Sequence, residues 1–325
     1  EMVIRDWSSD VCSSDLTMDI CAVIVTFNRL ECLKKALKKY EEQTKRPKYL
    51  LVVNNNSSDG TMEYLKIWEQ EQSEIQKVVV NLPCNTGGAG GFHAGMEKAL
   101  ELDCDWIWVS DDDAYPEPDA LKSMEVFYDS HPSLQERIAA MCGTIMDYDK
   151  EKILLGHHCR SKKVMGVAVM KEVPEEEYNK EFFDLDLVSY VGTVFKVEAI
   201  KKAGTTREDF FIYSDDWEHS MRVRKYGRII CVPKSLVLHV GESTTVSKKK
   251  EAVWHDYYST RNIIIALKEH FGLGAAGVRS ICRMLTAVST MNPRKIKIFS
   301  TAIRDAYREN TGIHPIYKPG WKEDK

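Results

Sequence analysis

Three consecutive carboxylates, Asp111, Asp112 and Asp113, directly follow a short apolar run that begins at Trp106. The aromatic and β-branched residues of this run predict a buried strand. Because side chains alternate along a strand, Asp111 and Asp113 should point one way and Asp112 the other. Carboxylates this close repel one another unless a cation neutralises them. The triplet therefore predicts a site for Mg²⁺ or Mn²⁺, which take oxygen ligands; a solvated acidic turn is the alternative.

Two further acids, Asp215 and Asp216, stand where another helix is expected to begin. Asp215 and Glu218 have the spacing of a capping box, which predicts a helix that starts here and ends near Gly227. The helix dipole would keep a carboxylate at this position ionised and hydrogen-bonded. These acids could serve only as caps, or one could act on a substrate. His239, at the end of a predicted strand, could likewise be structural or a metal ligand.

Four of the five residues from Gly87 to Gly91 are glycine, at the start of a helix expected to reach about Leu100. The dinucleotide spacing G-x-G-x-x-G is absent, because His93 occupies the third glycine position after Gly88 and Gly90. The Gly-Lys-Ser/Thr of a P-loop is absent as well. The glycines predict a backbone that passes close to a neighbour, with a flexible loop as the alternative.

The elements that must position these groups alternate between strands and helices. Strands are expected at 20–25, 49–53, 77–81 and 106–109. Three helices are expected between them: the first over about 30–43, the second ending at 68 and the third ending at about 100. This order implies an α/β fold with a largely parallel sheet and right-handed crossovers. Open sheets of this kind bind ligands at the carboxyl ends of their strands, where the Asp triplet stands.

The middle and the end of the chain have weaker patterns. Shorter strands are expected at 139–145, 153–155, 164–169, 187–197 (a pair, or one strand with a bulge at Gly192), 229–232 and 235–240. One helix should run from 254 to about 270, and an Asn292-Pro293 cap should open another that ends at Glu309 or Asn310.

The last predicted helix has two stripes. Ile296, Phe299, Ile303 and Ala306 form the apolar one, and Lys297, Arg304 and Arg308 form the basic one. The pattern is typical of a helix that packs on a core and leaves a basic face in solvent. Peripheral contact of the C-terminal helices with an anionic membrane is the alternative.

The composition narrows the class of protein. The 325 residues include 45 Lys and Arg against 49 Asp and Glu, a net charge of −4, which predicts no nucleic-acid partner. Nine cysteines occur without a CxxC pair, so neither a zinc site nor a disulfide framework is predicted. This cysteine usage predicts that the protein is located in a reducing cytoplasm. No apolar run of about 18 residues exists to span a membrane.

Residues 1–17 contain neither the apolar core of a secretion signal nor a helical or strand period. Trp7–Leu16 resembles a translated sequencing adapter, so we expect this leader to be non-native and Met18 to be the native start. The main domain is expected over 18–245 and a C-terminal helical region over 246–325. The residues favour no particular oligomeric state.

From about Ile20 to Gly312 the chain resembles an inverting family 2 glycosyltransferase with the GT-A fold, a mixed, mainly parallel sheet flanked by helices. Val25–Arg29 and Val52–Thr61 are similar to the nucleotide-binding segments of that family, and the Asp triplet stands where the family carries its DxD metal motif. The glycine-rich segment and the acids at 215–218 look most like the galactofuranosyltransferase branch.

The resemblance implies a role for each site residue. Asp111, Asp113 and His239 would bind Mg²⁺ or Mn²⁺, Asp216 would be the general base, and Asp215 would contact a substrate hydroxyl. The nucleotide-sugar would be bound by Thr26, Phe27, Asn28, Arg29, Asn54, Asp59, Asn85, Gly88, Asp111 and Asp112. The donor would be UDP-galactofuranose and the acceptor a glycan or lipid-linked glycan of the cell surface.

Other functions stay open. The neighbouring branch transfers rhamnose from dTDP-rhamnose. A metal-dependent phosphohydrolase also uses clustered Asp residues, but it would hydrolyse a nucleotide without a sugar acceptor. A non-catalytic nucleotide-sugar-binding module would tolerate the loss of Asp216.

Overall fold

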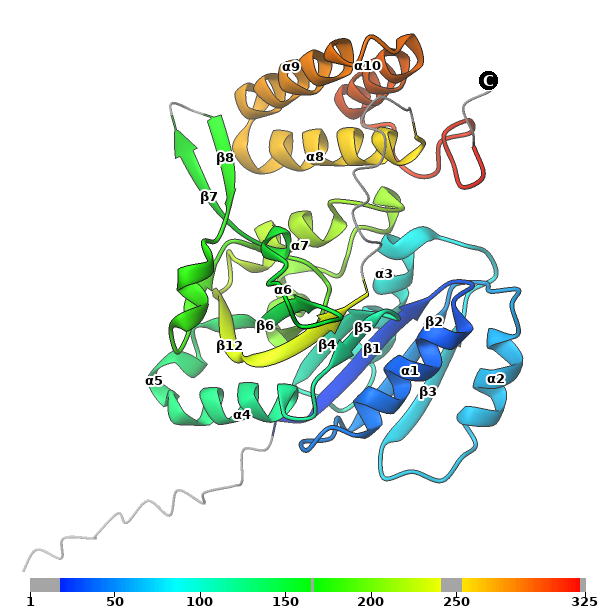
Figure 1. Ribbon diagram of the computed structural model, residues 1–325, viewed down its shortest axis with the longest axis vertical. Helices are drawn as coiled ribbons and strands as arrows, with labels where there is room; N and C mark the ends of the chain where they lie inside the picture. Colours follow the sequence, from blue (N-terminus) through cyan, green and yellow to red (C-terminus); the bar gives the residue numbers. More distant parts are fainter. Residues whose placement is uncertain (1–17, 165–166, 241–252, 322–325) are drawn as a thin grey trace, which may run out of the picture.

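A computed structural model describes residues 18–164, 167–240 and 253–321, with the side chains of 163–168 left out. In this part of the chain, one nine-stranded sheet forms the centre of the molecule, with helices on both faces (Figure 1). Its main path has the order β3-β2-β1-β4-β11-β6-β12-β5, and β9 pairs with β12. The predicted leader at 1–17 and the expected boundary at 245/246 lie outside the described residues.

The first half of the sheet is parallel, as the alternation of strands and helices predicts. It consists of β1 (Ile20–Thr26), β2 (Tyr49–Asn54), β3 (Gln76–Asn81) and β4 (Trp106–Asp111), connected by α1 (Leu30–Glu41), α2 (Thr61–Trp68) and α3 (Gly87–Leu100). Every residue of β1 and β2 is buried, because helices cover both faces of the sheet here. Their carboxyl ends therefore meet at one edge.

The second half of the sheet makes it mixed. β11 (Thr193–Lys196) is antiparallel to β4, and β12 (Arg228–His239) is parallel to β6 (Ile138–Asp147). β5 (Ala114–Pro116) pairs antiparallel with the last residues of β12, so that His239 stands opposite Ala114. His239 therefore lies at the same edge of the sheet as the Asp triplet.

Several predicted strands need correction. The strands expected at 229–232 and 235–240 are one strand, β12, with a register shift between Cys231 and Leu236 around Pro233. In the segment expected at 153–155, Ile153 makes only an isolated bridge, and the short helix η1 (Leu155–His157) follows.

The other two corrections concern segments that divide between two strands. The segment 187–197 contains β10 (Leu187–Val188) in a separate three-stranded sheet and β11 in the main sheet, with Gly192 between them in the left-handed region (φ 76°). The strand expected at 164–169 is the end of β7 (His158–Val164) and the start of β8 (Val167–Glu172), with 165 and 166 outside the described residues.

Shorter elements connect these strands. They are α4 (Ala120–Ser130), α5 (Pro132–Gln135), η2 (Glu175–Asn179), β9 (Phe183–Leu185), α6 (Val197–Ala203), η3 (Glu208–Phe210) and α7 (Asp215–Val223). The predicted capping box of α7 is wrong, because Ser214 is the N-cap and makes no side-chain cap hydrogen bond. Glu218 pairs with Arg222 instead, and the helix ends at Val223 rather than near Gly227.

The glycine-rich segment lies in a helix that packs very closely, not in a flexible loop. A Cβ added to Gly91 would lie 2.5 Å from Val25 Cγ1, and one on Gly95 would lie 2.4 Å from Val23 Cγ1. α3 can approach β1 at this distance only because these positions have no side chain. The predicted close approach of the backbone is therefore confirmed, and its neighbour is the central strand.

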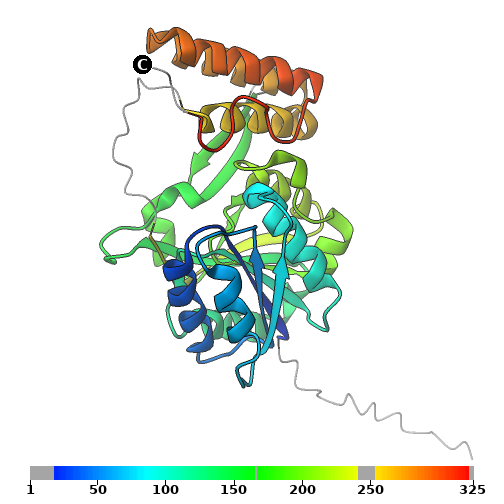
Figure 2. The ribbon, with the colours of Figure 1, turned by 90° about the vertical axis from the view of Figure 1, so that its right-hand side faces the viewer.

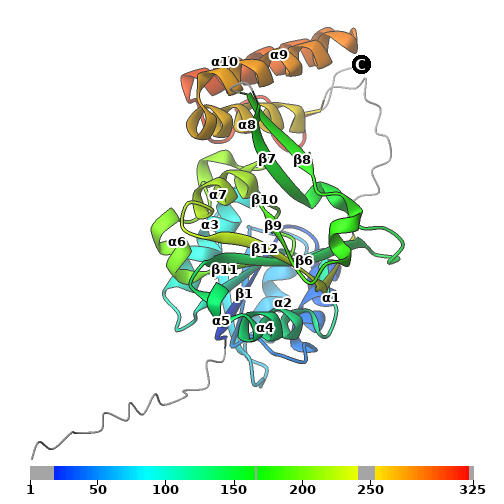
Figure 3. The same ribbon diagram turned by 90° about the vertical axis from the view of Figure 1, so that its left-hand side faces the viewer.

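Three helices follow the sheet and stack at one end of the molecule (Figures 2 and 3). They are α8 (His255–Phe271), α9 (Leu273–Ser289) and α10 (Pro293–Arg308). The predicted Asn292 cap is confirmed, since its side chain accepts from two backbone N–H groups, and α10 ends at Arg308. Sequence analysis did not identify α9. Within the described residues, no helix combines the length and the apolar character needed to cross a bilayer.

Candidate functional site

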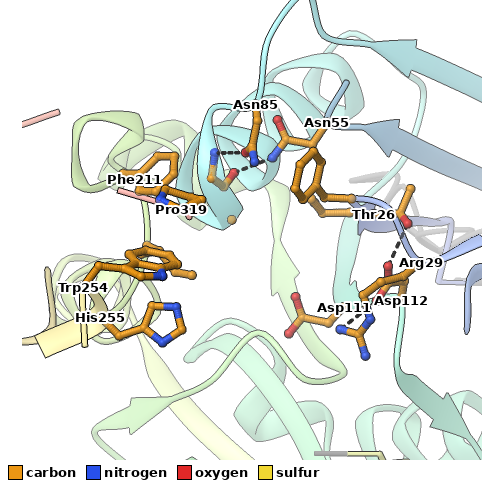
Figure 4. A pocket seen from close by; sticks show the side chains of 15 residues that line it. Thr26, Arg29, Asn55, Asn85, Asp111, Asp112, Phe211, Trp254, His255 and Pro319 are labelled. Carbon is orange, nitrogen blue, oxygen red and sulfur yellow. Dashed lines mark hydrogen bonds and ion pairs between the residues drawn. The ribbon is translucent and has the colours of Figure 1, made fainter. Parts of the chain in front are cut away.

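A pocket of about 470 Å³ lies at the sheet edge where β1, β2 and β4 end (Figure 4). Polar residues from the strand ends form one wall, the start of α3 forms the top, and the first residues of α8 form the opposite wall. The lining consists of Val25, Thr26, Phe27, Arg29, Asn55, Asn85, Gly87, Gly88, Asp111, Asp112, Phe211, Ile212, Trp254, His255 and Pro319. The pocket thus has an acidic side and an aromatic side.

Most of the predicted nucleotide-sugar residues share this pocket. Seven of them line it: Thr26, Phe27, Arg29, Asn85, Gly88, Asp111 and Asp112. The other three tie neighbouring strand ends together instead. Asn28 Oδ1 accepts from the backbone N–H of Ser58 at 2.7 Å, and Asp59 Oδ2 accepts from Leu30 N–H at 2.9 Å.

The third of these residues, Asn54, donates to Asn81 Oδ1 at 2.8 Å, across neighbouring strand ends. A donor-binding role for Asn28, Asn54 and Asp59 stays a prediction. Asn55 replaces them in the pocket wall, where its side chain accepts from Thr86 N–H and donates to the carbonyl of Gly87.

The aromatic side of the pocket was missed from the sequence. Trp254, His255 and Pro319 come from the C-terminal region and face the strand edge from across the pocket. The Trp254 and His255 rings pack edge to face with centroids 3.7 Å apart. Asn55, on the opposite wall, lies in a polar segment that the sequence analysis had already identified. The spacing of residues in the sequence does not connect residues 254 and 319 with β1.

Arg29 connects two of the three Asp carboxylates. Its guanidinium lies 3.2 Å from Asp112 Oδ1 and 2.7 Å from Asp113 Oδ2, while Thr26 Oγ1 donates to Asp112 Oδ2 at 2.7 Å. Burial raises the pKa of Asp112 to about 6, although Arg29 and Thr26 act in the opposite direction. Both oxygens of Asp112 therefore already have partners within the protein.

Asp111, Asp113 and His239 form a group of three candidate metal ligands. Their ligand atoms all lie within 4.8 Å of one another. The predicted strand alternation is not the cause, because β4 ends at Asp111 and the next two residues lie in a turn. Arg29 contacts both Asp112 and Asp113, so the prediction that these two acids point in opposite directions is wrong. His239 Nε2 lies 3.4 Å from Asp113 Oδ1. Burial and the nearby Asp113 raise the pKa of Asp111 to about 8, so negative charge at this site is poorly compensated.

The residues present fit a divalent cation. Two carboxylates and an imidazole are a donor set that Mn²⁺ and Mg²⁺ accept, with substrate oxygens completing the shell. His239 Nδ1 is buried without a hydrogen-bond partner in the described part of the chain, and Nε2 faces Asp113. A bound cation would also favour the ionised form of Asp111.

His157, which the sequence did not single out, lies beside this group. Its ring packs at right angles to His239 with centroids 5.3 Å apart, and its Nδ1 lies 2.8 Å from Ser189 Oγ. Burial and His239 lower the pKa of His157 to about 3, so this imidazole is neutral at physiological pH. It supports the His239 ring without adding charge.

The two acids of α7 occupy different environments from one another. Asp215 is buried, and burial together with Asp216 raises its pKa to about 8. Its charge also contributes to the raised pKa of Asp111, which places it near the metal-binding group. Asp216 Oδ1 accepts from Trp217 N–H at 2.7 Å, and burial raises its pKa to about 6. Neither carboxylate is among the residues that line the pocket.

Residues 21–164 match the profile of the family described as glycosyl transferase family 2. This part of the chain is therefore similar to family 2 glycosyltransferases. The matched range includes β1 to β4 and the Asp triplet, so the resemblance seen in the motifs is confirmed for this part of the chain. His239, Asp215 and Asp216 lie beyond the matched range.

Curated relatives match part of the chain. Galactofuranosyltransferase GlfT1 of Mycolicibacterium smegmatis is 37% identical over 97 residues, 30% of each chain. The Mycobacterium tuberculosis H37Rv protein of the same name is 35% identical over 109 residues, 31% of this chain and 32% of its own. The uncharacterized glycosyltransferase YwdF of Bacillus subtilis is 30% identical over 107 residues. The matches thus span about a third of each relative's length.

Solved structures extend the likeness in fold to nearly the whole chain. TarS 1–349 of S. aureus in complex with UDP-GlcNAc has a TM-score of 0.58 at 14% identity, over 89% of this chain and 81% of its own. GalNAc-T7 with UDP, GalNAc and Mn²⁺ has a TM-score of 0.59 at 13% identity, over 88% and 55%. The mannosyltransferase PcManGT of Pyrobaculum calidifontis reaches 0.52 at 15% identity, over 91% and 89%. The GT-A fold predicted from the sequence is confirmed.

Proposed function

We propose that this protein is a metal-dependent inverting glycosyltransferase that moves a sugar from a nucleotide donor to an acceptor hydroxyl. The observation that carries the proposal is the meeting of Asp111, Asp113 and His239 beside a pocket that Asp111 lines, in a chain whose residues 21–164 match family 2. The named relatives are galactofuranosyltransferases, and the fold neighbours were solved with UDP-sugars, GDP-mannose or Mn²⁺.

The geometry assigns a task to each side of the pocket. Asp111, Asp113 and His239 would hold Mg²⁺ or Mn²⁺, which supplies a Lewis acid for the developing charge on the departing diphosphate. Arg29, already bound to two carboxylates of this edge, would keep Asp112 oriented and add positive charge where the diphosphate binds. A metal-stabilised leaving group needs no second carboxylic acid to protonate it, unlike a leaving group in glycoside hydrolysis.

The acceptor hydroxyl needs a base, and we assign it to Asp216. A carboxylate whose pKa is raised to about 6 is ionised at neutral pH and yet basic enough to accept a proton in the transition state. Asp215, with a pKa near 8, is largely protonated at pH 7 and is better suited to donate a hydrogen bond to a substrate hydroxyl. Asp215 is the second candidate for the base.

UDP-galactofuranose is the proposed donor. This assignment rests on the names of the curated relatives and on the Asp triplet and glycine-rich segment that resemble their branch. Asp112 lines the pocket, where Arg29 and Thr26 hold its two oxygens. A pocket whose polar groups match the hydroxyls of one sugar discriminates strongly against another. Rhamnose transfer from dTDP-rhamnose is the alternative within the family.

A donor screen tests the proposed function. Protein that starts at Met18 is incubated with Mn²⁺, a mixed pool of glycan acceptors and one of four donors: UDP-galactofuranose, UDP-galactopyranose, UDP-glucose or dTDP-rhamnose. Mass spectrometry should detect an acceptor that has gained one hexose, from the furanose donor above all. Nucleotide hydrolysis without transfer would favour a phosphohydrolase, and UDP binding without any turnover would favour a binding module.

We also propose a lipid-linked glycan acceptor and peripheral contact with the inner face of a membrane. α9 exposes an apolar stripe at helical spacing, in which Ile281 is 61%, Leu285 65% and Val288 52% exposed. α9 and α10 together carry seven basic residues and one acidic residue, Asp305, which is buried and bound to Tyr257. An apolar stripe in a basic layer complements an anionic lipid surface.

Co-sedimentation with vesicles tests this contact. We expect binding to vesicles with anionic lipid at low salt, weaker binding at high salt, and loss of binding in the double variant Ile281→Asn/Leu285→Asn. Ile67→Asn is the matched control, because Ile67 on α2 is 67% exposed and lies in another part of the fold. No binding at low salt, or equal loss with the control variant, would contradict the proposal.

A further inference from the structure

Two cysteines and a histidine that are far apart in the sequence meet in the core of the second half of the sheet. Cys142 on β6 and Cys231 on β12 are directly paired across two parallel strands, and His158 is the first residue of β7. The two sulfurs and a ring nitrogen of His158 all lie within 4.8 Å of one another. All three side chains are buried, with His158 only 1% exposed.

One nitrogen of the histidine is fixed and the other has no partner. His158 Nδ1 lies 2.7 Å from the hydroxyl of Tyr178, and the two rings stack at a centroid distance of 5.9 Å. His158 Nε2 is buried without a hydrogen-bond partner in the described part of the chain. A buried nitrogen without a partner is free to bind a ligand, so the geometry favours a ligand at Nε2.

We propose that Cys142, Cys231 and His158 bind a Zn²⁺ ion. Two thiolates and one imidazole are a donor set that zinc prefers, and Tyr178 fixes the tautomer of the ligating ring, as outer partners of zinc histidines do. The charges decide between thiophilic cations. Zn²⁺ with two thiolates and a neutral imidazole has no net charge, whereas Cu⁺ would leave a buried negative charge uncompensated.

The thiols can supply this charge. Zinc binds the thiolate form of cysteine, so Cys142 would lose its proton when the metal binds. The Cys231 thiol donates to the carbonyl of Gly143 at a sulfur–oxygen distance of 3.7 Å, and it would lose its proton when the metal binds. Zinc binding therefore releases protons from the cysteines, and zinc affinity falls as the pH is lowered.

The site is distinct in chemistry and position from the carboxylate group at the sheet edge. Oxygen ligands there suit Mg²⁺ or Mn²⁺, whereas sulfur ligands here select zinc. The two sites are joined by consecutive residues, because His157 packs on His239 while His158 faces the thiols. Zinc would tie β7 to β6 and β12 and thereby hold the His157 ring against His239.

Metal analysis of the full-length protein, purified without chelators and without an affinity tag that binds metal, tests the proposal. We expect about one zinc per chain by elemental mass spectrometry. After removal of zinc, Co²⁺ added to the folded protein should produce the near-ultraviolet charge-transfer absorption of a cobalt–thiolate bond. The Tyr178→Phe variant, which keeps all three ligands, should bind zinc about 10–100-fold more weakly.

Controls separate this site from other metal-binding groups. The Cys142→Ser variant should contain no zinc, while Asp113→Ala and the double variant Cys21→Ser/Cys104→Ser should keep it. Cys21 and Cys104 are the matched control, because they are also neighbouring thiols but belong to no group of three metal-binding side chains among the described residues.

The proposal is overturned if the native protein has no stoichiometric zinc and shows no thiolate absorption with Co²⁺. It is also overturned if zinc disappears with Asp113→Ala, since the ion would then belong to the carboxylate group. If Cys142→Ser does not fold, Tyr178→Phe and direct analysis of the native protein still decide the question. None of these outcomes depends on sugar transfer.

Discussion

Replacing Asp216 by Asn should abolish most turnover while leaving the fold and donor binding intact. The Asp216 oxygen that accepts from Trp217 N–H has a counterpart in the amide oxygen of Asn, so the start of α7 keeps its hydrogen bond. An amide cannot accept the acceptor proton, and general-base assistance contributes about 10²–10⁴-fold to rate. We therefore expect turnover to fall by about this factor, with UDP affinity unchanged.

The stability of this variant follows from the direction of the pKa shift. Folding raises the pKa of Asp216 from 3.8 to about 6, so the folded state favours the protonated carboxyl. The stabilisation of the folded state by proton binding to Asp216 is fully present below the pKa of the unfolded state. It is lost as the pH rises through about 6. Asn does not ionise, so the melting temperature of Asp216→Asn at pH 7 should equal or exceed that of the native protein.

The pH dependence of turnover tells the two acids apart. If Asp216 is the base, turnover should fall about tenfold for each pH unit below about 6. If Asp215 is the base, the same acid limb should lie near pH 8. The assay is transfer from a saturating donor at fixed ionic strength, with Asp215→Asn as the matched variant. Turnover of Asp216→Asn within a few-fold of native would refute the assignment.

Three further substitutions test the site and its supports. Asp113→Ala should remove the metal dependence of UDP binding measured by calorimetry, because it deletes one ligand and the partner of His239 Nε2. Asp112→Asn should reduce the preference for the furanose donor in a comparison of initial rates, and equal preference to native would leave Asp112 as a purely structural partner of Arg29. Gly87→Ala should lower the free energy of unfolding by about 2 kcal/mol or more in a urea titration, since Gly87 has φ +73° and a Cβ would lie 2.0 Å from the Phe211 carbonyl.

The first half of the fold could be predicted because its signals are local. Continuous apolar runs at β1 and β2 and the abrupt change to polar residues at their ends fix both the strands and the edge that carries the Asp triplet. Asp111 and Asp113 do share one group with His239, but strand alternation is not the reason, because β4 ends at Asp111 and Asp113 lies in the following turn.

The remaining features depend on tertiary contacts that local spacing does not encode. The capping box at Asp215 and Glu218 was wrong because Glu218 is engaged by Arg222 and His270 instead. The aromatic wall at Trp254 and the group of Cys142, Cys231 and His158 bring together residues from distant parts of the chain. Without an adjacent pair such as CxxC, no sequence motif announced those thiols.

The stripe of α9 was missed for a different reason. No helix was predicted over residues 273–289, so the stripe of Ile281, Leu285 and Val288 was not predicted either. Only the packing of α9 on α8 and α10 shows that these side chains face outward.

Calorimetry of UDP binding with and without Mn²⁺ tests the central claim most directly. The account predicts that Mn²⁺ increases the affinity of the native protein for UDP, and that Asp113→Ala binds UDP equally weakly in both conditions. The reason is that Asp111, Asp113 and His239 would hold the cation that contacts the diphosphate. An affinity of the native protein that does not change with Mn²⁺ or Mg²⁺ would contradict the account.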